Sequence, residues 1–276
     1  MAQCALQGAP GGAGDGGATG MFSRTNIRTL LATALALALV AIAAASSARA
    51  DPEVLWKIVH DQCAAGEAAR GEPAPCLAVN LAHGDAVLKD RTGATQVLLI
   101  PTARVSGIES AALLAPHAPN YFWDAWQARA FVEKLAGKPI PRDDLALAVN
   151  SIDGRSQNQL HIHVDCIRAD VSTALQNADI RPGAVWTPVT LAGHPYRARR
   201  LSQSDLQRRN LFRLIAGGDA AARANMGLET LVVVGATFIN GPPGFILLED
   251  HVNPEAGDYA SGEELQDHDC KVLAAP

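Results

Sequence analysis

A long uncharged segment near the amino terminus constrains this chain more than any other feature of its sequence. Arg24 and Arg28 precede it, and residues 29–48 contain no charged side chain. The tripeptide Ala48-Arg49-Ala50 follows, with small residues at the positions that a signal peptidase prefers. This order of basic, apolar and small residues predicts a secretory signal peptide and therefore an exported protein.

Two other interpretations of the same segment remain open. Twenty uncharged residues can just cross a bilayer, so residues 29–48 could instead be an uncleaved membrane anchor. A buried core helix is the third interpretation. We therefore expect a protein associated with the inner membrane and facing the periplasm, or free in the periplasm if the segment is removed after Ala50. Residues 1–20 are mostly Gly and Ala and are interpreted as a disordered leader, with Met21 as an alternative start.

Export changes the interpretation of the cysteines. Beyond Cys4 the chain has four, and an even number in an exported chain indicates disulfides. The four are Cys63, Cys76, Cys166 and Cys270. Cys63 and Cys76 flank a loop-like stretch whose closure would contribute about 3 kcal/mol. Cys166 and Cys270 would then pair by elimination, although four cysteines allow three connectivities. No C-x-x-C pair is present, so a cysteine zinc site is not expected.

Residues 51–276 show no linker or repeat, and we expect one domain. The apolar patterns predict helices over 52–69, 120–136, 201–224 and 263–272, and strands over 86–89, 95–100, 145–149, 159–167, 231–235 and 245–248. Strands outnumber long helices and several neighbours have hairpin spacing, which predicts an α+β fold with a largely antiparallel sheet and flanking helices. The net charge is −5 and no basic tail is present, so we expect no nucleic-acid partner.

One predicted strand carries an unusual set of polar residues. Because alternate side chains of a strand share a face, Leu160, Ile162, Val164 and Cys166 are expected to face the core. The other face would then hold Gln159, His161, His163 and Asp165. A polar loop of Arg155, Ser156, Gln157 and Asn158 comes directly before this strand. A half-exposed strand could carry polar residues for solubility alone, but two imidazoles beside a carboxylate favour a functional site.

Two kinds of chemistry fit these residues. An imidazole whose other nitrogen is held by a hydrogen bond is a good nucleophile for phosphorus, and the side chains of residues 155–159 could donate to phosphate oxygens. His-x-His on a strand also suits zinc, so a metal-dependent phosphoesterase with His161, His163 and Asp165 as ligands is an alternative. A non-catalytic exported protein that binds nucleotides or lipids is a further alternative.

The segment resembles the histidine-triad motif, with Asp165 in place of the third histidine. Its surroundings resemble one family within the HIT-like superfamily, the CDP-diacylglycerol pyrophosphatases. The similar segments are LKDRTGATQVLLIPTARVSGIES (88–110), PNYFWDAWQAR (119–129), SQNQLHIHVDCIR (156–168) and EELQDHDC (263–270). This resemblance implies a HIT-like fold and hydrolysis of CDP-diacylglycerol, or a related nucleotide diphosphate, at a membrane surface. It implies no metal or other cofactor.

The resemblance also implies roles for single residues. His163 matches the middle histidine of the triad and would be the nucleophile, and His161 would orient and polarise the site. Asn158 lies where related proteins hold a hydroxyl residue beside the phosphate. Asp165 departs from the triad, so its role is open. Lys89 and Arg104 are expected either to contact phosphate or to be ordinary surface charges.

The length of this region also bears on its architecture. Its 226 residues are long for one histidine-triad unit, so the chain could hold a duplicated, pseudo-dimeric unit. A homo-oligomer is the other arrangement that the resemblance suggests.

Overall fold

The computed structural model describes residues 51–274, except residues 184 and 240. The predicted signal peptide or anchor lies outside the described residues. Within them, no helix combines the length and the apolar composition that crossing a bilayer would require.

The described residues form one antiparallel sheet of ten strands. Its order is β1-β2-β3-β5-β4-β8-β9-β7-β6, and β10 pairs with the end of β5. The strands are β1 (Ala78–Asn80), β2 (Asp85–Lys89), β3 (Val97–Pro101), β4 (Leu145–Val149), β5 (Ile162–Ile167), β6 (Thr187–Leu191), β7 (His194–Ser202), β8 (Glu229–Ala236), β9 (Gly244–His251) and β10 (Gln266–Asp267). The predicted α+β class with an antiparallel sheet is confirmed.

Helices lie on both faces of the sheet. The α-helices are α2 (Val54–Lys57), α3 (Ala65–Arg70), α4 (Tyr121–Ala136), α5 (Ala169–Asn177), α6 (Gln203–Arg208), α7 (Leu211–Gly218) and α8 (Ala220–Ala224). The π-helical segment η1 (Ile58–Ala64) joins α2 to α3. Short 3-10 turns are η2 (Ala111–Leu114), η3 (Arg142–Asp144), η4 (Met226–Leu228), η5 (Pro254–Ala256), η6 (Gly262–Leu265) and η7 (Lys271–Ala274).

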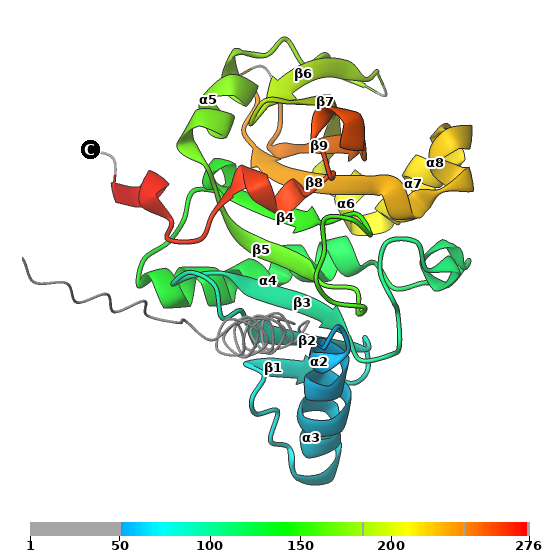
Figure 1. The fold of residues 1–276 in the computed structure, drawn as a ribbon. Helices are drawn as coiled ribbons and strands as arrows, with labels where there is room; N and C mark the ends of the chain where they lie inside the picture. Colours follow the sequence, from blue (N-terminus) through cyan, green and yellow to red (C-terminus); the bar gives the residue numbers. More distant parts are fainter. Residues whose placement is uncertain (1–50, 184, 240, 275–276) are drawn as a thin grey trace, which may run out of the picture. The chain divides into compact units, whose positions relative to one another are not determined.

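The two faces have separate apolar cores. On one face, Phe122 and Trp126 of α4 and Phe212 of α7 pack against the sheet. On the other, Val171 of α5 and Leu265 of η6 pack against Ala148 and its neighbours. Figure 1 shows the carboxyl-terminal segment, in red, crossing β4 and β5 on the face opposite to α4. This segment therefore covers strands that would otherwise be exposed to solvent.

The strand order is the same when read from the centre of the sheet in either direction. One half runs β4-β5-β3-β2 and the other β8-β9-β7-β6, and the two meet where β4 pairs with β8. In chain order, each half is a hairpin, a helical segment and a second hairpin. The equivalent pairs of strands in the two halves are therefore β4 and β8, β5 and β9, β3 and β7, and β2 and β6.

Two predicted helices are wrong. Residues 201–224 begin in β7 and continue as three short helices, because Ser202, Asn210 and Asp219 each accept hydrogen bonds from backbone N–H groups at a new helix start. Residues 263–272 form η6, β10 and the start of η7, because residues 266–267 pair with the end of β5.

Both expected disulfides are present. Cys63 of η1 is bonded to Cys76, and Cys166 of β5 is bonded to Cys270. The second bridge joins two cysteines that are 104 residues apart in sequence. It therefore fixes the carboxyl-terminal segment on strand β5.

Candidate active site

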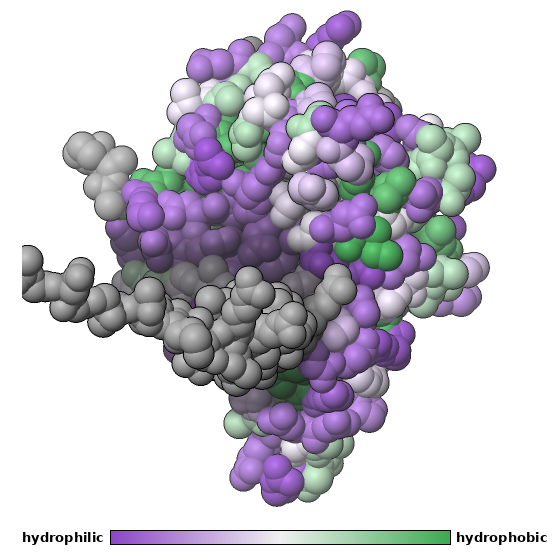
Figure 2. Space-filling model, viewed as in Figure 1, coloured by the Kyte–Doolittle hydropathy of each residue, from purple (hydrophilic) through white to green (hydrophobic). Residues whose placement is uncertain are grey.

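A cavity of about 820 Å³ lies beside the beginning of β5 and is lined by both polar and apolar side chains. The polar part includes Lys89, Asn150, Arg155, His161, His163 and Glu263. The apolar part is formed by Val54, Leu55, Ile58, Leu88 and Leu98. On the side seen in Figure 2, hydrophilic residues gather in the hollow over β4 and β5. The site can therefore contact a charged group and a hydrocarbon group at the same time.

The alternation predicted for β5 is confirmed, but the polar face is not exposed. Leu160, Ile162, Val164 and Cys166 belong to the core shared with α4. His161, His163 and Asp165 lie on the opposite face with exposed fractions of 8%, 4% and 0%. The carboxyl-terminal segment covers this face, so the histidines lie in a partly desolvated cavity. Strand β5 starts later than expected, at Ile162, because Leu160 N donates to the carbonyl of Val105 outside the sheet.

The backbone fixes the orientation of the His161 ring. Its Nδ1 donates to the carbonyl oxygen of Gln159 at 2.7 Å, since a carbonyl can only accept. The hydrogen is therefore on Nδ1, and Nε2 retains its lone pair. Burial lowers the pKa of His161, which keeps the ring neutral. Its ring lies edge-on to that of His163, with 4.9 Å between the centroids.

His163 lies against a carboxylate and an amide. Its Nδ1 is 2.8 Å from Gln96 Nε2 and 3.3 Å from Glu263 Oε1. Its Nε2 is buried and has no hydrogen-bond partner among the described residues. Burial lowers the pKa of His163 to about 4, although the nearby Glu263 charge acts in the opposite direction. The ring is therefore neutral near pH 7.

Glu263 is held by two amides and remains ionised. Gln96 Nε2 donates to Oε1 and Asn150 Nδ2 donates to Oε2, each at 3.1 Å. Burial alone would raise the pKa of Glu263, but the His163 imidazole and these two donors outweigh it and lower the pKa. A negative charge is thus fixed beside the His163 ring.

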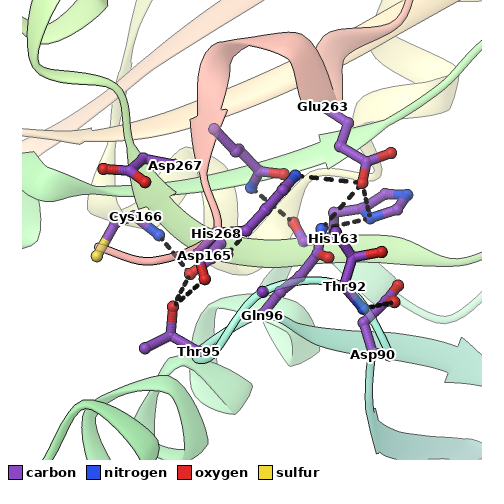
Figure 3. Close-up of polar contacts among 12 residues, drawn as sticks. Asp90, Thr92, Thr95, Gln96, His163, Asp165, Cys166, Glu263, Asp267 and His268 are labelled. Carbon is purple, nitrogen blue, oxygen red and sulfur yellow. Dashed lines mark hydrogen bonds and ion pairs between the residues drawn. The ribbon is translucent and has the colours of Figure 1, made fainter. Parts of the chain in front are cut away.

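Asp165 contacts a third histidine and does not line the cavity. The buried carboxylate accepts hydrogen bonds from Thr95 Oγ1 at 2.8 Å, Cys166 N at 2.9 Å and His268 Nδ1 at 3.0 Å. Nε2 of His268 is 3.5 Å from Glu263 Oε1. Figure 3 shows the resulting chain of contacts from Asp165 through His268 and Glu263 to His163. The hydrogen bond to Asp165 raises the pKa of His268, which favours its charged form.

The predicted loop donors are only partly brought together. Arg155, Ser156 and Gln157 line the cavity, whereas Asn158 does not. The Arg155 guanidinium forms two hydrogen bonds to Glu109, at 2.6 and 2.8 Å, so much of its charge is already balanced. The Gln157 side chain accepts a hydrogen bond from Leu55 N.

Three further predicted residues have different surroundings. Gln159 is fully buried and donates to the carbonyls of Pro101 and Ala103, so it supports the backbone rather than the cavity. Lys89 lines the cavity and donates to the carbonyl of Asp90 at 2.6 Å. Arg104 does not line the cavity; it pairs with Glu53 and lies over the ring of Trp56.

Four residues of the site were missed by sequence reasoning: Gln96, Asn150, Glu263 and His268. The signal for two of them was present in the segment EELQDHDC, which places an acid and a histidine close to a cysteine. A helix over 263–272, as the pattern predicts, would not place these polar residues against β5; the observed η6 and β10 do.

The geometry does not favour a metal held by the strand residues. Within the described residues, His161, His163 and Asp165 do not bring three donor atoms within 4.8 Å of one another. The Asp165 carboxylate contacts Thr95 and His268 instead. The zinc ligand set of the metal-dependent alternative is therefore not assembled from these three side chains.

Comparison with known proteins gives one consistent result. The model of the CDP-diacylglycerol pyrophosphatase family matches residues 50–274. A CDP-diacylglycerol pyrophosphatase from Yersinia pestis is 44% identical over 224 residues, which cover 80% of this chain and 85% of that protein. The match includes the strand that carries His161 and His163 and the segment that carries Glu263 and His268. The chain therefore belongs to the CDP-diacylglycerol pyrophosphatase family.

Proposed function

We propose that this protein hydrolyses CDP-diacylglycerol to CMP and phosphatidate through a covalent nucleotidyl-histidine. The observation that carries the proposal is the pair of neutral, buried imidazoles in a cavity with one polar and one apolar wall. The polar wall suits a diphosphate and the apolar wall suits the start of an acyl chain. Family membership supplies the substrate class.

In the first step, Nε2 of His163 attacks the phosphorus that carries cytidine. A nitrogen–phosphorus bond forms, and the bond from that phosphorus to the bridging oxygen breaks. Phosphatidate leaves with the bridging oxygen and its electron pair. The His163 ring becomes positively charged, and Glu263 at 3.3 Å from Nδ1 stabilises that charge in a partly desolvated site. His161 has a neutral carbonyl as its Nδ1 partner and lacks this stabilisation.

The Gln96 amide sets a balance between two tautomers of His163. When Gln96 Nε2 donates to Nδ1, the ring hydrogen is on Nε2 and the lone pair needed for attack is absent. When Nδ1–H instead donates to Glu263, Nε2 is free to attack. Glu263 therefore favours the reactive tautomer. Asp165 and His268 act through Glu263, because the charged His268 ring holds the carboxylate in place.

In the second step, water attacks the nucleotidyl-histidine and CMP is released. Nε2 of His161 has a lone pair and can take the proton of that water. The nitrogen–phosphorus bond breaks, and its electron pair returns to His163. Ser156, Lys89 and Arg155 line the same cavity and are the nearest candidates to contact the phosphate oxygens.

The two halves of the sheet support the expected architecture. We assign each half to one HIT-like unit, since both have the same order of hairpin, helical segment and hairpin. The site residues of β5 then belong to the first unit. A second chain is not needed to complete the sheet in this arrangement.

We also assign the protein to the outer side of the inner membrane. The two disulfides and the apolar segment 29–48 support export. Protease treatment of intact spheroplasts should digest the protein if it faces the periplasm. Protection of the full chain in that experiment would contradict this assignment.

The covalent route is tested by intact-protein mass spectrometry. The full chain in detergent micelles is mixed briefly with CDP-diacylglycerol and EDTA and quenched without acid. A mass increase equal to a CMP group that maps to His163 is expected. It should be absent in His163→Ala and unchanged in the control His117→Ala, because His117 is an exposed loop residue that does not line the cavity.

Each other result has a defined meaning. An adduct on His161 would keep the covalent route but overturn the assignment to His163. Activity that EDTA abolishes and zinc restores would favour the metal-dependent alternative. Binding of substrate without CMP release would favour the non-catalytic alternative.

A further inference from the structure

We propose that the second half of the sheet contains a binding site for a divalent transition-metal ion, formed by His194, Asp250 and Asp258. These residues come from the start of β7, from β9 and from the loop that follows β9. Their donor atoms all lie within 4.8 Å of one another. This site is separate from the cavity that contains His161 and His163.

The two carboxylates are buried and each has one unused oxygen. Asp250 and Asp258 have exposed fractions of 6% and 1%. Oδ1 of Asp250 accepts from His251 N, and Oδ1 of Asp258 accepts from Ala260 N. Oδ2 of each is buried and has no hydrogen-bond partner among the described residues. Two desolvated oxygens of like charge are costly unless a cation or a proton lies between them.

The surroundings complete a site for a cation. Glu264 Oε1 lies 2.8 Å from His194 Nδ1 and also accepts from Tyr196 Oη at 2.8 Å. Glu264 therefore fixes the His194 ring and adds a third negative charge nearby. The same Nδ1 lies 3.8 Å from Asp258 Oδ1, so an ion bound there takes the place of the Nδ1 proton. The His194 side chain is 26% exposed, which provides a path for an ion from solvent.

The donor set indicates which ions would bind. One imidazole with two or three carboxylates suits borderline ions such as Mn²⁺ or Zn²⁺, whereas Mg²⁺ and Ca²⁺ prefer oxygen ligands alone. A proton shared between the two carboxylates is the competing explanation. Burial, together with the neighbouring Asp258, raises the pKa of Asp250 to about 7. A protonated Asp250 is therefore the form expected when no ion is bound.

A second cluster serves as a comparison. His83, Asp85 and Asp124 also bring three donor atoms close together. None of their side-chain oxygens or nitrogens is among the buried, unpartnered atoms of the described residues, and His83 is exposed. The argument for an ion therefore applies to Asp250 and Asp258 and not to this cluster.

The place of the proposed site in the fold suggests its role. Asp250 lies on β9 and His194 on β7, the strands equivalent to β5 and β3 in the first half. Glu264 follows Glu263 directly, and both belong to η6. A bound ion would therefore hold His194, which contacts Glu264 of η6, while Glu263 of the same segment contacts His163.

The test is ion binding by the full chain in detergent after removal of metals with EDTA and dialysis. Titration with MnCl₂ alone, followed by electron paramagnetic resonance of free Mn²⁺, should give one saturable site per chain. Asp250→Asn should weaken binding by at least about tenfold, as expected for loss of a ligand. His194→Ala provides a second variant, because His194 is partly exposed and its replacement leaves the buried carboxylates unchanged.

The control is Asp124→Asn, which should leave Mn²⁺ binding unchanged. In the absence of metal, Asp250→Asn should be at least as stable as the unmodified chain, because one of two like charges is removed. Mn²⁺ should raise the melting temperature of the unmodified chain but not that of Asp250→Asn. Absence of saturable binding, binding insensitive to both Asp250→Asn and His194→Ala, or binding lost in Asp124→Asn would each overturn the proposal.

Discussion

The disulfide between Cys166 and Cys270 is predicted to contribute more to stability and to activity than the one between Cys63 and Cys76. The bridged cysteines are 104 and 13 residues apart in sequence. In the chain-entropy model, closing loops of these sizes contributes about 4.7 and about 2.9 kcal/mol at 25 °C. Removal of the Cys166–Cys270 bridge should therefore lower the free energy of unfolding by about 1.8 kcal/mol more than removal of the Cys63–Cys76 bridge.

The two bridges also differ in what they position. Cys166 follows Asp165 directly, and Cys270 lies two residues after His268. Loss of this bridge releases the segment that places Glu263 beside His163, and a displacement of about 1 Å in such a contact can lower kcat about a hundredfold. The Cys63–Cys76 bridge instead supports η1, whose Ile58 lies in the apolar wall, so its loss should mainly raise KM.

The assay compares two double variants, Cys166→Ala/Cys270→Ala and Cys63→Ala/Cys76→Ala, in the full chain. Urea unfolding gives the stability of each, and release of CMP at saturating substrate gives kcat. The matched pair controls for the general effect of removing two cysteines. Equal losses of stability, together with an unchanged kcat in the Cys166/Cys270 variant, would refute the reasoning.

Two further predictions concern the surroundings of His163. In the proposed covalent route neutral His163 is the nucleophile, so kcat should fall as pH falls through about 4. The Glu263 charge raises the pKa of His163, so Glu263→Gln should move the acidic limb of the pH–kcat profile to lower pH and also lower kcat. An acidic limb near pH 6.5 in both proteins would contradict this prediction. In Gly262→Ala, the new Cβ would lie 2.5 Å from Val232 Cγ2, so a stability loss of about 1–3 kcal/mol and a lower kcat are expected. The control Gly217→Ala meets no atom within 4 Å and should keep both, as thermal melting and CMP release would show.

Local sequence patterns predict six of the ten strands and describe the later helices poorly; β1, β6, β7 and β10 have no predicted counterpart. The strand at 145–149 was predicted with its observed bounds, because its apolar run is buried on both faces. The helix predicted over 201–224 is instead divided by Ser202, Asn210 and Asp219, each of which starts a new helix. Capping residues inside an apolar pattern therefore override its helical periodicity.

The candidate donors around the phosphate illustrate a different limit. Arg155 lines the cavity as expected, but Glu109, 46 residues away in sequence, balances much of its charge. Gln159 was expected on the cavity face, but its amide holds the backbone at Pro101 and Ala103. Both are ordinary polar residues in sequence, and only their distant partners show how they are used.

The sequence by itself determined the α+β class, the alternation that separates His161 and His163 from the core, and the four cysteines that pair. These follow from the period of two in a strand and from the even number of cysteines in a chain that is expected to be exported. Both signals act over a few residues or through composition. The tertiary structure alone decided that Glu263 and His268 lie beside β5, about 100 residues away in sequence. Their approach depends on the order of strands in the sheet and on the path of the carboxyl-terminal segment. No local propensity encodes that path, because the contacts that hold it join residues about 100 positions apart in the sequence.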